Sequence, residues 1–219
     1  MFLNRYNRER VLRLFPYINN KSDLNKLKID NDSITYITSK EFAEKISQII
    51  IGHILKFEVE PKNIIITDAM AGVGGNAISF AKYFKHVYAI EIDEERSSFL
   101  ENNLAVYNLT NTDVHNDSCL TYVPNILDHN IIFIDPPWGG KGYKTFINLK
   151  LKIDEIEIET ICNNFMNLQL MKKVPELIVL KLPINYDIKY LYDQVKNCKM
   201  YLYELDKMII IVIEKLKEI

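Results

Sequence analysis

Cysteine is scarce in this 219-residue chain, and its three copies, Cys119, Cys162 and Cys198, lie far apart in the sequence. The four histidines form no ligand-spaced pairs with them. This spacing argues against a disulfide framework and against a zinc site, so we expect no metal. A run of 18 or more apolar residues is also missing, which argues against a membrane-spanning helix.

The chain also lacks a strong excess of either charge, since its formal net charge is −2. The charges are nevertheless uneven, because residues 1–28 carry about +5 and the remainder about −7. The basic residues of this arm are Arg5, Arg8, Arg10, Arg13, Lys21, Lys26 and Lys28. A basic arm on an acidic body suits contact with phosphate. A solvated basic helix is the simpler alternative.

Apolar residues make up 48% of the chain and charged residues 26%, as in ordinary globular proteins. A chain of this length can bury a full core in one main domain. Its polar, basic start does not resemble a secretory signal. We therefore expect a soluble intracellular protein that does not enter a membrane.

Only seven glycines are present, yet three of them, Gly72, Gly74 and Gly75, fall within four residues. They follow an apolar strand predicted at 64–68 and precede a helix predicted at 76–84. Glycine permits positive φ and close approach of the backbone to a ligand. Glu91 ends the next predicted strand 19 residues after Gly72, near the spacing at which an acid meets a ribose hydroxyl. This pattern indicates a nucleoside-binding βαβ unit.

The glycine pattern alone does not choose between a nicotinamide cofactor and S-adenosylmethionine. Asp68 stands just before the turn, where it would repel a pyrophosphate but suit an ammonium and a sulfonium group. Asp117 follows the short predicted strand 113–116 and is placed to accept the adenine amino hydrogens. Three acids at three strand ends favour S-adenosylmethionine.

A second motif begins at Asp135, where two prolines and Trp138 follow the apolar strand 131–134. The prolines end the strand because neither can donate to a ladder. Asp135 and the Pro136 carbonyl offer acceptors for the hydrogens of an exocyclic amine, and Trp138 offers a ring for the base to stack on. The simpler alternative is a tight turn with a core tryptophan.

Strand and helix patterns alternate from residue 64 onward, which predicts an α/β fold with a mostly parallel sheet. The predicted elements are 64–68, 76–84, 87–92, 94–107, 113–116, 131–134, 154–168, 177–181, 188–195, 200–205 and 207–216. The last two strands are joined almost directly, so one strand must be reversed. Before the sheet, Thr38 and Glu41 form a capping box that opens an amphipathic helix within 33–56.

These motifs together resemble the trimethylguanosine synthase family, the RNA cap guanine-N2 methyltransferases. The resemblance rests on residues 68–76, 89–93 and 135–143, and it extends to residues 13–15, 37–43 and 181–185. It implies a class I, Rossmann-like methyltransferase domain at 57–219, with residues 1–56 as a helical N-terminal extension that contributes to the substrate site. It also implies S-adenosylmethionine as donor and 7-methylguanosine-capped RNA as acceptor. We expect a monomer.

The resemblance assigns roles to individual residues. The cofactor site would contain Thr38, Asp68, Gly72, Gly74, Glu91 and Asp117. The catalytic loop would comprise Asp135, Pro136 and Trp138. The substrate site would contain Phe15, Asn103, Trp138, Tyr143 and Lys181. A 7-methylguanine is cationic, so Trp138 would add a cation–π contact to stacking.

The chain departs from the family at two places. Lys141 and Gly142 stand where the family usually has Pro and an acid, and Ile184 stands where it usually has Arg. An expected phosphate contact is therefore missing, and Lys181 or the N-terminal basic arm is the candidate replacement. Two other functions remain open: methylation of an internal RNA or DNA amine, and cap binding by an inactive scaffold.

Overall fold

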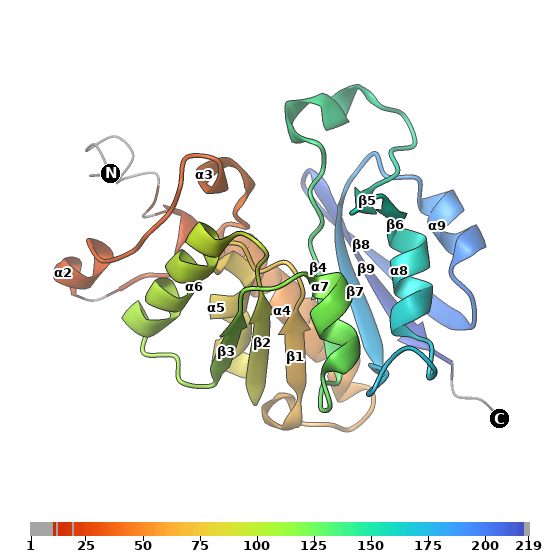
Figure 1. The fold of residues 1–219 in the computed structure, drawn as a ribbon, viewed down its shortest axis with the longest axis horizontal. Coiled ribbons are helices and arrows are strands. Elements are labelled where there is room, and N and C mark those ends of the chain that lie inside the picture. The colour runs from red at the N-terminus through yellow and green to blue at the C-terminus, as the bar shows by residue number, and fades with distance from the viewer. Residues whose placement is uncertain (1–10, 12, 19, 217–219) are drawn as a thin grey trace. The chain divides into compact units, whose positions relative to one another are not determined.

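The computed structural model describes residues 11, 13–18 and 20–216 (Figure 1). They form two compact units, one up to Ser118 and one from Cys119 onward. In the described part of the chain, no helix is long and apolar enough to cross a membrane. Arg5, Arg8 and Arg10 of the predicted basic arm lie outside the described residues.

The first unit contains three parallel strands in the order β3-β2-β1. Its elements are α2 (Lys21–Leu24), α3 (Ser33–Tyr36), α4 (Lys40–Leu55), η1 (Pro61–Asn63), β1 (Ile65–Asp68), α5 (Gly75–Tyr83), β2 (His86–Ile90), α6 (Glu94–Val106) and β3 (Thr112–His115). Helix α5 packs on β1 and β2, and α6 packs on β3. All four residues of β1 are buried, and the strand begins with two apolar residues, Ile65 and Ile66.

Helix α4 joins this core through an apolar stripe. Ala43, Ile46, Ile50 and Ile54 recur every three or four residues and are buried. The stripe faces α5, where the hydroxyls of Ser47 and Ser79 lie 2.7 Å apart. The N-terminal segment is therefore part of the first unit's packing.

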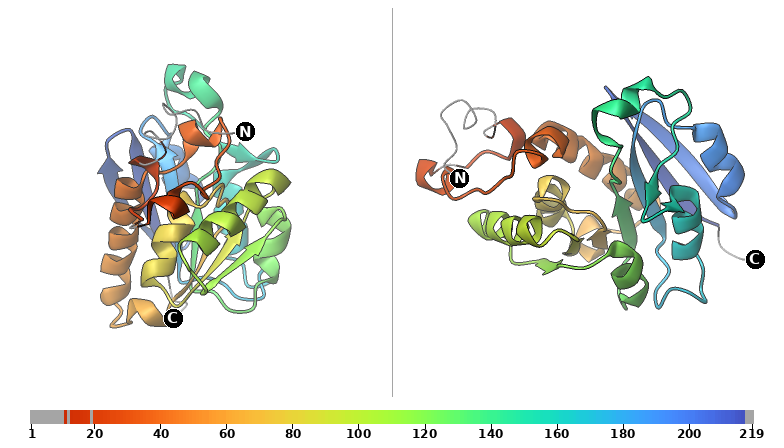
Figure 2. Two further views of the ribbon diagram at one scale, coloured as in Figure 1. Left: turned by 90° about the vertical axis from the view of Figure 1, so that its left-hand side faces the viewer. Right: turned by 45° about the horizontal axis from the view of Figure 1, so that its top comes forward.

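The second unit contains four strands in the order β4-β7-β9-β8. Its elements are α7 (Cys119–Tyr122), η2 (Val123–Asn125), β4 (Ile131–Ile134), η3 (Gly140–Thr145), β5 (Lys152–Ile153), β6 (Ile156–Glu157), α8 (Ile158–Phe165), β7 (Leu177–Pro183), α9 (Ile188–Gln194), β8 (Cys198–Leu205) and β9 (Met208–Lys215). Strands β4 and β7 are parallel, whereas β9 is antiparallel to both β7 and β8. Figure 2 shows α8 and α9 beside these strands.

The predicted fold class is confirmed. The fold is α/β, with seven strands in a mostly parallel sheet and one reversed strand, β9. The reversal occurs at a two-residue turn, in which Asp206 adopts a φ of 55°. Positive φ at a tight hairpin turn matches the twist of the two strands it joins.

Two local predictions were wrong. Thr38 is not the N-cap of α4, because the helix begins one residue later and Ser39 holds that position without a side-chain cap bond. The helix predicted at 154–168 begins only at Ile158. Asp154 and Glu155 have φ of 47° and 64°, and these left-handed residues turn β5 into β6.

Candidate active site

The glycine turn of the first unit is shaped for close approach of a ligand. Gly72 and Gly74 have φ of 55° and 104°, a region that side chains other than glycine rarely adopt. A Cβ on Gly74 would lie 3.0 Å from Leu100, whereas one on Gly72 would meet nothing within 4 Å. The backbone at Gly72 therefore borders open space, as a nucleoside-binding turn requires.

Glu91 fixes this turn from the end of β2. Its two carboxylate oxygens accept hydrogen bonds from the amide of Gly72, at 2.8 Å, and from the amide of Asp93, at 2.9 Å. A carboxylate has about four lone-pair sites, so Glu91 can accept further donors such as ribose hydroxyls. The Asn116 side chain, which the sequence did not single out, holds the same corner by donating to the carbonyls of Glu91 and Ile92.

The other two predicted cofactor acids follow strands β1 and β3. Asp68 is fully buried at the carboxyl end of β1. Asp117 is exposed and accepts a hydrogen bond of 2.7 Å from the amide of Ser118. Because β1, β2 and β3 are parallel, Asp68, Glu91 and Asp117 share one edge of this unit's strands, where α/β folds bind ligands.

Thr38 lies against the glycine turn. Its hydroxyl accepts a hydrogen bond of 3.1 Å from Asn76 at the start of α5. A Cβ on Gly75 would come within 2.8 Å of the Thr38 carbonyl and 2.7 Å of the Ile37 side chain. Only glycine at position 75 allows this approach, which explains why the third glycine follows the other two.

Asn103 holds another part of the N-terminal segment to the same turn. Its amide donates to the carbonyls of Val73, at 2.9 Å, and Lys28, at 2.8 Å, and it accepts from the Lys28 amide, at 2.8 Å. Asn103 and Phe15 are both buried in this structure. Their contact with a substrate stays a prediction.

In the second unit, Asp135 follows β4 and forms an ion pair with Lys181 of β7. The Lys181 ammonium lies 2.5 Å from the Asp135 carboxylate, and Lys181 is only 4% exposed. The same ammonium lies 5.0 Å from the ring centre of Trp138. The sequence did not predict this pair, because its members are 46 residues apart. It follows from the register, in which Ile134 pairs with Leu180.

Tyr143 contacts Trp138 of the Asp135 loop, which comprises residues 135–138. The ring of Tyr143 meets the indole edge-on, with 5.2 Å between ring centres, and Pro136 is buried. The indole nitrogen of Trp138 is buried and has no hydrogen-bond partner among the described residues. A buried donor of this kind usually finds a partner. The loop therefore presents an unused N–H beside a carboxylate and two aromatic rings.

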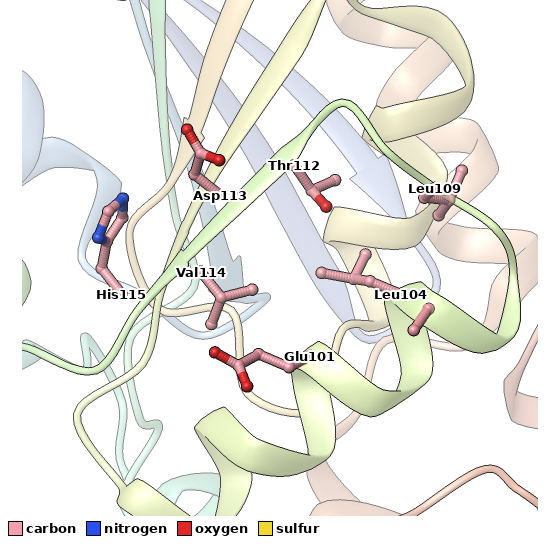
Figure 3. Close-up of a pocket in the computed structure, with 8 residues that line it drawn as sticks. Glu101, Leu104, Leu109, Thr112, Asp113, Val114 and His115 are labelled. Atoms are coloured by element: carbon pink, nitrogen blue, oxygen red, sulfur yellow. The ribbon is translucent and has the colours of Figure 1, made fainter.

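A hollow of about 320 Å³ lies elsewhere in the first unit, between α6 and β3 (Figure 3). Figure 3 shows Glu101 and Val114 on one side of β3 and Asp113 and His115 on the other. Burial lowers the pKa of His115, against the opposing effect of nearby carboxylates. No predicted site residue lines this hollow, so it lies apart from the candidate site.

The side chains near the glycine turn can be compared with the needs of a metal ion and of an adenosine ligand. Among the described residues, no group of three or more His, Cys, Asp or Glu side chains could hold a metal ion. The three cysteines are free, and burial raises the pKa of the Cys162 and Cys198 thiols. The residues present around the glycine turn fit an adenosine ligand, since they combine an open glycine backbone with carboxylate acceptors.

Comparison with known proteins gives a consistent picture. A family model for RNA cap guanine-N2 methyltransferases matches residues 63–215. An uncharacterized protein of Acanthamoeba polyphaga mimivirus is 37% identical over 220 residues, which cover 92% of this chain and 84% of that protein. The trimethylguanosine synthase of Schizosaccharomyces pombe is 33% identical over 112 residues, covering 46% of this chain and 43% of that one. A Geobacter sulfurreducens methyltransferase structure aligns with a TM-score of 0.54 at 10% identity, over 95% of this chain and 88% of that one.

Proposed function

Because the chain belongs to the RNA cap guanine-N2 methyltransferase family, we propose that it methylates guanine N2 of a 7-methylguanosine RNA cap. It is a methyltransferase, and S-adenosylmethionine is its cofactor. The cap guanine as acceptor is the part that we propose. The Asp135 loop carries this proposal, because it combines acceptors for an amine with an aromatic platform for a base.

On the cofactor side, the first unit offers partners for the ammonium group, the ribose and the adenine of the donor. Asp68 suits the ammonium group, Glu91 the ribose hydroxyls and Asp117 the adenine amine. S-adenosylmethionine supplies a methyl group on a positively charged sulfur. Gly72 leaves room for the ligand against the backbone, and Thr38 and Gly74 complete the proposed site.

On the acceptor side, an exocyclic amine is a weak nucleophile because its lone pair is delocalised into the ring. Asp135 and the Pro136 carbonyl would accept the amine hydrogens and hold the nitrogen in place. Lys181 would hold the Asp135 carboxylate in one orientation through their ion pair. Most of the rate enhancement would then come from positioning and fixed charges.

Trp138 would provide the stacking surface for the methylated base. Stacking of a base on an aromatic ring contributes roughly 1–3 kcal/mol, and a cationic base adds a cation–π contribution. Tyr143 would support the indole edge-on. The family resemblance adds Phe15, from the N-terminal extension, and Asn103, from helix α6, as further substrate contacts.

In this proposal Lys181 does not contact the phosphates of the cap. Its ammonium is buried and held by Asp135 on one side and the Trp138 ring on the other. This surrounding favours a position beside the reacting amine. The phosphates of the cap would need another set of cations.

The test is mass spectrometry of a capped dinucleotide incubated with the protein and S-adenosylmethionine. We expect one or two methyl groups to be added to a 7-methylguanosine cap, and fewer or none to an unmethylated cap. Asp135→Ala should abolish most turnover while cofactor binding, measured by calorimetry, is retained. Preferential methylation of long uncapped RNA would instead support an internal amine as acceptor. Cap binding without any cofactor binding would support an inactive cap-binding scaffold.

A further inference from the structure

The segment that follows the Asp135 loop is basic throughout. This segment, residues 139–152, contains four lysines, Lys141, Lys144, Lys150 and Lys152, and neither Asp nor Glu. The side chains of the last three are exposed. An uninterrupted run of positive charge on an otherwise acidic chain is the electrostatic pattern of a phosphate-binding surface.

Two large apolar side chains stand between these lysines. Phe146 is 58% exposed and Ile147 is 89% exposed. Figure 1 shows the connection between β4 and β5, which carries both residues, extending away from the strands of the second unit. Lysines that alternate with an exposed aromatic ring are typical of surfaces that bind single-stranded nucleic acid, where cations follow the phosphates and rings stack on bases.

The segment is fixed rather than loosely attached, because Asn185 holds it from the end of β7. The Asn185 amide donates 2.8 Å hydrogen bonds to the carbonyls of both Tyr143 and Phe146. Its backbone carbonyl accepts from the Leu149 amide at 2.9 Å, and the Leu149 carbonyl accepts from Asp187 at 2.9 Å. A surface held in this way loses little conformational entropy when it binds a ligand.

The segment is also continuous with the proposed acceptor site. Tyr143, whose carbonyl Asn185 holds, meets Trp138 edge-on, and the Lys144 ammonium lies 5.8 Å from the Tyr143 ring centre. A chain attached to a base at Trp138 would therefore meet Lys144 soon after leaving the base. Lys150 lies over the Tyr190 ring and Lys152 lies 3.7 Å from Glu155. Both contacts are at the surface, where a phosphate can compete with them.

We propose that residues 139–152 bind the RNA chain that follows the cap. Lys144, Lys150 and Lys152 contact its phosphates, and Phe146 and Ile147 pack against its first unstacked bases. This inference rests on the proposed function, and it adds a preference for capped single-stranded RNA over the bare cap. It also supplies the cations that the buried Lys181 cannot offer to phosphate.

The test compares a capped dinucleotide with a capped single-stranded RNA of about a dozen nucleotides, a length within the usual range of site sizes. We expect the wild-type protein to bind the RNA about tenfold more tightly than the dinucleotide. The variant Lys144→Gln/Lys150→Gln/Lys152→Gln should lose this advantage and still bind the dinucleotide as the wild type does. The slope of log K against log salt concentration for RNA binding should become shallower by about two, since each phosphate contact to a single strand contributes about 0.7 to that slope.

The matched control is Lys82→Gln/Lys85→Gln/Lys199→Gln, which removes the same charge from exposed positions outside the segment. It should keep the preference for RNA. Phe146→Ala should weaken RNA binding about fivefold or more and leave the dinucleotide unaffected.

The outcomes separate this inference from the proposed function. Equal affinity of the wild type for both ligands, together with methylation of the dinucleotide, would overturn the RNA surface and leave the proposed function intact. If no cap is methylated, the same RNA without a cap becomes the probe. The surface would still be supported if the wild type and the control variant bound this uncapped RNA in a salt-dependent way and the Lys144→Gln/Lys150→Gln/Lys152→Gln variant did not. If the wild type did not bind the uncapped RNA, the proposed RNA surface would be overturned.

Discussion

The Lys181 ammonium and the Asp135 carboxylate lie 2.5 Å apart at the carboxyl ends of two paired strands, β7 and β4. Lys181 is almost completely buried, and the Asp135 side chain is 17% exposed. Two charges in such a place depend on each other, because removing one leaves the other without compensation. Stability and activity should therefore respond differently to single and double substitutions of this pair.

We predict that Lys181→Met destabilises the protein by about 3 kcal/mol, since it leaves the Asp135 carboxylate uncompensated in a largely buried site. Denaturant unfolding measures this change. The double variant Asp135→Asn/Lys181→Met should recover most of the lost stability, because no buried charge is left, yet it should remain inactive. Equal stability of Lys181→Met and wild type would contradict the structural role of the pair.

We predict that Gly75→Ala destabilises the protein by about 1–3 kcal/mol and weakens S-adenosylmethionine binding. The added Cβ would come within 2.8 Å of the Thr38 carbonyl, so the N-terminal segment or the glycine turn must shift. Gly52→Ala is the control. A Cβ there meets nothing within 4 Å, and alanine in a helix should stabilise by about 0.5–1 kcal/mol. Calorimetry and thermal unfolding test both variants, and similar effects of the two would disprove the close packing.

We predict that Trp138→Ala weakens cap binding by roughly 1–3 kcal/mol, while cofactor affinity changes little. Trp138→Phe should keep much of the affinity, and the preference for the methylated base should disappear in the alanine variant. Trp138 is the only tryptophan in the chain, so its fluorescence reports directly on this contact. Fluorescence that does not change when a cap analogue is added, while the cofactor still binds, would show that Trp138 does not stack on the base.

We predict that His129 contributes to a loss of stability as the pH falls below about 6.5, the ordinary pKa of histidine. His129 is buried and hydrogen-bonded to the Lys173 carbonyl at 2.8 Å, and burial lowers the pKa of its imidazole. The unfolded chain therefore takes up a proton on His129 at a higher pH than the folded protein does. The contribution of His129 to the free energy of unfolding is fully present above about pH 6.5. It decreases on acidification by at most about 1.4 kcal/mol per pH unit. In His129→Gln, unfolding measured from pH 5 to pH 8 should show a shallower loss.

Most strands could be predicted from the sequence because they are buried and apolar, and the predicted 131–134 agrees with β4 at both ends. The parallel direction of most strands follows from the alternation of strands and helices, but their order in the sheet, β3-β2-β1-β4-β7-β9-β8, was not predicted. The hairpin of β5 and β6 could not be predicted in this way. Each of its strands has only two residues, and its turn depends on left-handed Asp154 and Glu155, for which composition gives a weak signal.

The candidate site was predictable where a single motif contains it, as in the glycine turn and residues 135–138. It was not predictable where distant residues meet. The pairing of Lys181 with Asp135 depends on the register of β4 and β7, and the role of Asn185 depends on where the chain returns after β7. The role of Asn116, which holds two backbone carbonyls, also could not be predicted from a motif, because any asparagine could make these bonds. Asn103 was named from the sequence as a substrate contact, but its hydrogen bonds to Val73 and Lys28 were not predicted.

The hydrogen bonds of Asn103 have a consequence for any shortened version of the chain. Asn103 joins the Val73 carbonyl of the glycine turn to both backbone groups of Lys28, and Thr38 fills the space that Gly75 leaves open. A fragment that starts at residue 57 would keep every strand of the sheet, but Asn103 would lose both of its hydrogen bonds to Lys28. The segment that contains Lys28 and Thr38 therefore cannot be exchanged independently of the glycine turn, and a chimera would have to exchange both together.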